Sequence, residues 1–69
     1  MTVKERASAL LTSDPARALC DRCLARVLGV DPSTGHRAAT KISRSDDFCR
    51  EWAQCSDCRE TRFVTRSLR

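Results

Sequence analysis

The apolar positions in the N-terminal part of the chain predict a helix. Val3, Ala7, Leu10 and Leu11 are three or four residues apart, so a first helix near Val3–Leu11 is expected. The segment "TSDP" then breaks the pattern, with an aspartate that can cap a helix and a proline suited to a first helical position.

The next segment has the strongest helical period. Its apolar residues, at i, i+3, i+4, i+7 and i+8, are Ala16, Leu19, Cys20, Cys23, Leu24, Val27 and Leu28. They predict an amphipathic helix with one buried stripe, ended by Gly29. The helix begins near Ala16 or as late as Cys20. Either start places Cys20 and Cys23 one turn apart on one face.

A third helix, at residues 34–44, follows the turn "VDPSTG". Its expected inner face is small and apolar: Gly35, Ala38, Ala39 and Ile42. Its expected outer face is polar and basic: His36, Arg37, Thr40, Lys41 and Arg44. A glycine in the first turn leaves the exact start of this helix open.

The pattern changes to alternation from Phe48 onward. "FCREWAQ" alternates, and "ETRFVTRS" alternates and is rich in β-branched and aromatic residues, which predicts a β-hairpin. "CSDC" lies in the turn between them. A metal-binding knuckle often has glycine after its second cysteine, but Arg59 stands here. The turn is therefore either strained or of another type.

The length of 69 residues allows one domain, residues 1–69, of class α+β: three helices and a two-stranded hairpin. A domain this small buries a modest core, and only three residues are aromatic. Such a domain usually needs disulfides or a metal to hold it together.

Cysteine usage favours a metal. The count of five is odd, and no secretory or transmembrane segment is evident, so a cytoplasmic protein with reduced thiols is expected. Two C-x2-C pairs then predict one tetrahedral zinc ion on Cys20, Cys23, Cys55 and Cys58. A disulfide or redox role is the weaker alternative, and iron has similar ligands. Cys49 is left over and is interpreted as a small, half-buried apolar residue.

The same residues argue against an enzyme. A catalytic zinc keeps an open coordination position and needs an acid or base nearby. The chain has one histidine, His36, and no H-x-E motif with the cysteines. A structural zinc, with no small-molecule substrate, is the expectation.

Charge points to an anionic partner. The formal net charge is +4, and a zinc with four thiolates adds −2, which leaves +2. The hairpin keeps basic residues at Arg59, Arg62 and Arg66. Arginine suits phosphate and base recognition, although abundant arginine codons in a GC-rich genome would give the same composition.

The order of these segments also resembles a known family. "CDRCLARVLGV", a polar helix, "FCR", "CSDC" and "TRFVT" are similar to the small bacterial zinc-containing winged helix-turn-helix domains, over about Leu19–Thr65. In that family the first C-x2-C pair lies on the positioning helix and the second lies in a zinc-bound wing. The resemblance implies DNA binding, alone or as a module of a larger protein. Arg59 departs from the family's usual glycine.

The residues themselves support double-stranded DNA as partner. The second helix of a helix-turn-helix enters the major groove, and its outer residues meet bases and phosphates. The expected contacts are Ser33, Thr34, His36, Arg37, Thr40, Lys41 and Arg44 from the helix and Arg59, Arg62 and Arg66 from the wing. The hypothesis is a nucleoid-associated transcriptional regulator. The alternative is that the charged face of the helix contacts only solvent.

Two alternative functions and one rival fold remain open on the sequence. The domain could be a zinc-stabilised protein-interaction module, since acidic residues interrupt its basic surface, or a redox sensor that ejects zinc with Cys49 as the extra thiol. The first helix could serve as a homodimer face. A treble-clef fold would need a helix after Cys58, where the β-branched sequence disfavours one.

Overall fold

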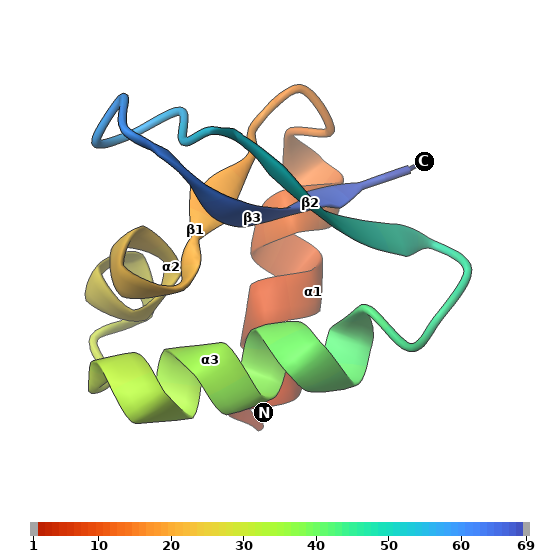
Figure 1. Ribbon diagram of the computed structural model, residues 1–69. Helices are drawn as coiled ribbons and strands as arrows, with labels where there is room; N and C mark the ends of the chain where they lie inside the picture. The colour runs from red at the N-terminus through yellow and green to blue at the C-terminus, as the bar shows by residue number, and fades with distance from the viewer. Residues whose placement is uncertain (1, 69) are drawn as a thin grey trace.

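The computed structural model describes residues 2–68 and contains three helices and a three-stranded antiparallel sheet in that range (Figure 1). The elements are α1 (Val3–Ser13), β1 (Leu19–Cys20), α2 (Asp21–Leu28), α3 (Pro32–Ile42), β2 (Phe48–Gln54) and β3 (Thr61–Ser67). The strand order is β1-β3-β2. The α+β class with three helices is confirmed. The predicted two-stranded sheet was incomplete, because β1 is a third strand.

The start of the second helix differs from the earlier of the two predicted starts. The chain turns at Pro15 and Ala16, extends through β1, and enters α2 only at Asp21, with Cys20 as N-cap. Leu19 and Cys20 pair with β3 instead of continuing a helix. The apolar residues of this segment looked like one helix because β1 and then α2 both point apolar side chains into the same core.

Two residues of the predicted apolar stripe are on the surface, Ala16 in the turn before β1 and Val27 on α2. Val27 is 42% exposed, whereas Cys23, Leu24 and Leu28 are buried. The helix α2 has only eight residues, so its inward face is narrow. Gly29 ends it in the left-handed conformation, with φ of 72°, as the sequence indicated.

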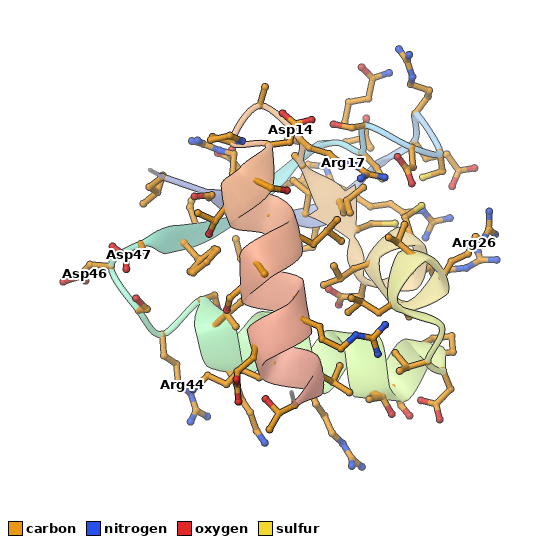
Figure 2. All side chains as sticks on the ribbon, turned by 180° about the vertical axis from the view of Figure 1, so that it is seen from behind. Asp14, Arg17, Arg26, Arg44, Asp46 and Asp47 are labelled. Atoms are coloured by element: carbon orange, nitrogen blue, oxygen red, sulfur yellow. The ribbon has the colours of Figure 1, made fainter. Side chains whose placement is uncertain are left out.

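The third helix is shifted by two residues relative to residues 34–44. Asp31 caps it through a 2.8 Å bond from the Thr34 N–H, and Pro32 takes the first helical position. The helix ends at Ile42, so Arg44 lies beyond it and projects away from the body (Figure 2).

The predicted inner face of α3 is buried. Gly35 makes a close approach possible, because a Cβ there would lie 2.6 Å from Ala25 Cβ on α2. The two helices therefore cross in near contact at this pair, which fixes where the outer face of α3 points.

The core lies between the sheet and the helices. In Figure 1, α1 stands behind the sheet, α2 lies at the left and α3 runs below. The largest fully buried side chains are Leu11, Leu19, Leu24, Ile42, Val64, Thr65 and Cys55. They come from all three helices, from β1 and β3, and from the hairpin turn, and β2 packs against this core through the partly buried Phe48 and Ala53. Over residues 2–68, no helix has the length and apolar character needed to cross a membrane.

The predicted hairpin is present, although Val64 and Thr65 are both buried, so burial does not alternate along β3. Phe48 pairs with Ser67 at one end and Gln54 with Thr61 at the other. The turn between Gln54 and Thr61 carries the second cysteine pair, as predicted.

Candidate metal centre and nucleic-acid interface

The fold brings the four predicted cysteines together. The Sγ atoms of Cys20, Cys23, Cys55 and Cys58, here called the cysteine quartet, all lie within 4.8 Å of one another. Tetrahedral Zn–S bonds of 2.3 Å imply sulfur separations of about 3.8 Å. Cys20 and Cys58 are 4.0 Å apart, which is compatible with a shared ion. The quartet could therefore hold one metal ion.

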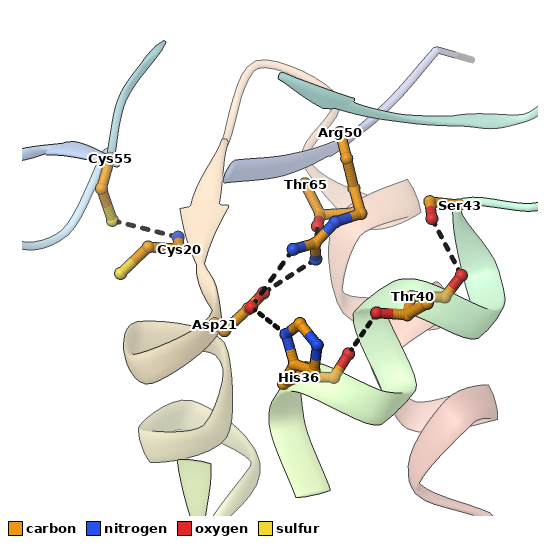
Figure 3. A network of polar contacts seen from close by, with 8 residues as sticks. All are labelled: Cys20, Asp21, His36, Thr40, Ser43, Arg50, Cys55 and Thr65. Carbon is orange, nitrogen blue, oxygen red and sulfur yellow. Dashed lines mark hydrogen bonds and ion pairs between the residues drawn. The ribbon is translucent and has the colours of Figure 1, made fainter. Parts of the chain in front are cut away.

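Backbone N–H groups stabilise a thiolate at one corner of the quartet. Burial by itself would raise the pKa of Cys55, but the N–H groups of Cys20, Cys58 and Asp57 point at its sulfur and lower that pKa to about 6. The Cys20 N–H lies 3.4 Å from this sulfur (Figure 3). Cys55 is fully buried, so its thiolate form needs a cation beside it.

In the first cysteine pair, the pKa values are shifted in the opposite direction from that of Cys55. Burial raises the pKa of Cys20, and burial together with the neighbouring sulfurs strongly raises that of Cys23. Sulfurs crowded at this distance repel one another as thiolates. A thiophilic cation at the centre would remove both penalties, because it pairs with every thiolate. The donor set therefore fits a soft or borderline divalent metal.

The hairpin turn is anchored to the segment before β1. Ser56 N donates to Ala18 O at 2.7 Å, and Ala18 N donates to Ser56 Oγ at 3.0 Å. Arg17 adds an ion pair with Asp57 at 3.2 Å. These contacts hold the turn against the chain next to Cys20, so the quartet is assembled by backbone as well as by side chains.

Arg59 closes this turn in a strained conformation. Its φ is 65°, in the left-handed region that glycine favours. Its N–H donates to Cys55 O at 3.0 Å, and its carbonyl accepts from Gln54 Nε2 at 3.0 Å. Of the two turn types expected from the missing glycine, the strained one is present.

Cys49 lies apart from the quartet. It is half-buried on β2, opposite Arg66, and is not part of the metal-competent group. This placement agrees with its interpretation as a small apolar residue.

His36 takes part in a polar network that the sequence did not reveal. Its Nδ1 lies 2.7 Å from Asp21 Oδ2, and Arg50 binds the same carboxylate at 2.8 and 3.2 Å (Figure 3). Arg50 also donates to Thr65 at 3.1 Å. Burial opposes ionisation of Asp21, yet the bonds from Arg50 and His36 hold its pKa below the ordinary 3.8. The network ties the start of α2 to α3 and to both strands of the hairpin.

Two exposed cations lie on α3. One of them, Arg37, lies near Asp31, whose pKa is lowered by hydrogen bonds from Thr34 and Ser33 and also by the Arg37 charge. Arg37 and Lys41 are exposed, and neither makes an ion pair with any residue from 2 to 68. Thr40 lies on the same helix but donates its hydroxyl to His36 O at 2.9 Å. Helical spacing places Arg37 and Lys41 on one stripe.

The polar groups at the start of α3 are less available to a phosphate than the sequence suggested. Ser33 Oγ donates to Asp31 at 2.8 Å, and the Thr34 N–H is bound to the same carboxylate. These groups serve the helix cap, and the carboxylate would repel a phosphate there.

A cation from α1 joins the α3 cations. Lys4 and Arg44 line a groove of about 580 Å³ together with Ser8, Lys41, Ile42, Ser45 and Phe48. We call Lys4, Arg37, Lys41 and Arg44 the basic face. Sequence reasoning missed Lys4, because nothing in the pattern of the first helix shows that it crosses α3.

The wing arginines are mostly neutralised. Arg62 is hydrogen-bonded and ion-paired to Glu60, and Arg66 pairs with Glu51 at 2.6 Å. Arg59 is exposed and makes no ion pair within the described part of the chain. The wing is therefore less basic than its arginine count suggests.

Comparison with known proteins adds no family to this picture: no family model, curated protein or solved structure matches the chain. Its function is argued from its own residues.

Proposed function

We propose that this protein is a non-catalytic, zinc-stabilised winged helix-turn-helix domain that binds double-stranded DNA and regulates transcription. The observation that carries the proposal is the basic face. Its four cations come from two helices and the segment after α3, and no carboxylate among the described residues pairs with them. Duplex DNA offers a regular row of phosphates to such a face.

The arrangement of elements supports the winged helix-turn-helix assignment. The helices α2 and α3 are joined by the short turn at Gly29–Asp31, and a hairpin follows α3. The strand β1 pairs with the middle of β3 as a third strand and does not change this order. In this assignment α3 enters the major groove, and the turn at residues 55–60 reaches the flanking backbone.

Zinc is the proposed ion. Zinc favours four thiolates in a closed tetrahedral site, which needs no open coordination position and no catalytic base. In this arrangement the metal would clamp the wing to the start of α2. Its role is to keep the hairpin and α3 in fixed relation while α3 meets DNA.

The test is a selection of random duplexes with the purified protein, followed by binding titrations at several salt concentrations. Enrichment of one sequence is expected, with affinity that falls steeply as salt rises. Arg37→Ala and Lys41→Ala should each weaken binding and reduce the magnitude of the salt slope by about 1, because one phosphate contact is lost.

Arg26→Ala is the matched control. Arg26 is an exposed arginine on α2, away from the basic face, and its loss should leave affinity within about twofold. If no duplex is bound, or if Arg37→Ala and Lys41→Ala bind as tightly as the parent protein, the proposal is wrong.

A further inference from the structure

We infer that the wing carries a stacking platform for an unpaired DNA base, formed by Trp52 and Phe63. The inference rests on the proposed function and narrows its target: a duplex that adjoins a single-stranded segment. The platform lies on β2 and β3, outside the basic face.

The two rings are exposed and adjacent. Trp52 is 70% exposed and Phe63 is 46% exposed. They are directly paired across the hairpin, so their side chains lie on the same face of the sheet. A contiguous pair of exposed rings is an uncommon feature in a chain with three aromatic residues.

The fold does not explain this exposure. The buried core contains neither ring. Arg50 lies over Phe63, with its guanidinium carbon 4.9 Å from the ring centroid. Exposed aromatic surface is unfavourable in water, and its burial against a flat ring system would be stabilising.

A chain of contacts connects the platform to the DNA-facing helix. Arg50 lies over Phe63 and binds Asp21, and Asp21 binds His36 on α3. The platform is therefore held in fixed relation to α3. A single strand that leaves a duplex bound at α3 could therefore reach the rings along the hairpin.

The charge and shape of the surroundings favour a nucleobase. The carboxylates linked to these strands are Asp21, which binds the Arg50 that lies over Phe63, and Glu51 and Glu60, and each is ion-paired with an arginine, which weakens its repulsion of a phosphodiester strand. The next residues on this face are polar, Gln54 and Thr61. The other large exposed apolar side chains of residues 2–68, Val27 and Leu68, lie on α2 and beyond β3. Two flat rings with polar neighbours suit a base, because every base has a π-face.

The platform contains its own reporter. Trp52 is the single tryptophan, and the chain has no tyrosine, so intrinsic fluorescence reports on this site. The experiment compares the selected duplex, blunt-ended, with the same duplex carrying a three-thymine overhang. We expect the overhang to quench Trp52 fluorescence and to tighten binding roughly 5- to 100-fold, the range typical of one stacked base.

Variants separate stacking from other effects. Trp52→Ala should remove the overhang advantage and leave affinity for the blunt duplex within about twofold, and Trp52→Phe should retain most of the advantage. Leu68→Ala is the matched control, because Leu68 is comparably exposed and lies outside the platform. Equal affinity for the two duplexes, or an overhang advantage that survives in Trp52→Ala, would overturn the inference.

Two further outcomes are distinguishable. If neither duplex is bound, the proposed function fails, and quenching by free oligothymidine then decides whether the rings bind bases. If sedimentation shows a dimer that Trp52→Ala dissociates, and DNA causes no quenching, the rings bind a second copy of the chain and the inference is wrong.

Discussion

Arg59 adopts an unfavourable backbone conformation in the turn that holds the cysteine quartet together. A left-handed φ costs an L-residue with a Cβ roughly 1–2 kcal/mol relative to glycine, and Arg59 adopts it next to the quartet. Its backbone closes the turn through bonds to Cys55 and Gln54. These bonds, together with the contacts that hold the turn beside Cys20, over-determine the turn, so the strain persists.

Replacement of this residue by glycine should relieve the strain. Arg59→Gly is expected to raise the free energy of unfolding of the metal-loaded protein by about 0.5–1 kcal/mol, because glycine adopts φ of 65° without a Cβ clash. Urea denaturation measures the change. Arg59→Ala, which keeps the Cβ, should show no gain. A glycine variant less stable than the alanine variant would contradict this account of the turn.

At the scale of elements, one contact positions α3. The helices α2 and α3 touch at Ala25 and Gly35, where a Cβ on Gly35 would also lie 2.9 Å from Asp21 O. The Asp21–Arg50–His36 network then joins α3 to the hairpin. Small residues set the approach of the two helices, and the polar bonds set their orientation toward the sheet.

Gly35→Ala should therefore destabilise the protein. Alanine normally stabilises a helix interior by up to about 1 kcal/mol, but here its Cβ would overlap Ala25 and backbone, so a loss of about 1–3 kcal/mol is expected. Chemical denaturation measures it. Lys41→Ala, on the exposed side of the same helix, should change stability by less than about 0.5 kcal/mol. A stabilised Gly35→Ala variant would show that the helices are not in contact there.

At the scale of the whole molecule, the core is small, and a core of this size stabilises the fold only modestly by itself. The buried apolar residues come mainly from short elements, and β1 has two residues. The proposed metal joins Cys23 to Cys55 across residues 24–54, which closes a loop of 31 residues and restricts the unfolded chain. Metal binding energy then becomes folding energy.

Removal of the metal should unfold the domain. A strong chelator is expected to abolish most helical circular dichroism at 25 °C, and zinc should restore it. Cys58→Ser should have the same effect, whereas Cys49→Ser, outside the quartet, should leave a folded, metal-loaded protein. Elemental analysis gives the metal content. A chelated protein that still unfolds cooperatively with native helicity would refute a structural metal.

Local patterns predicted much of the fold and of the metal site. The spacing of the two C-x2-C pairs was enough to predict the quartet, since two such pairs in a reduced chain have few other uses. The periods of α1, α3 and the hairpin were also readable, because these elements bury one face each. The short strand β1 was not, because two residues carry no period and pair only with a strand more than forty residues away.

The sequence by itself determined the order of the three helices and the hairpin, the cysteines of the quartet and the presence of basic residues on α3, because each depends on near neighbours and side-chain chemistry. Only the tertiary structure decided which charges are free. It paired Arg62 and Arg66 with acids, engaged His36 with Asp21, and brought Lys4 beside Lys41. Those pairings depend on how distant elements cross, and distance in space is not encoded in any local period.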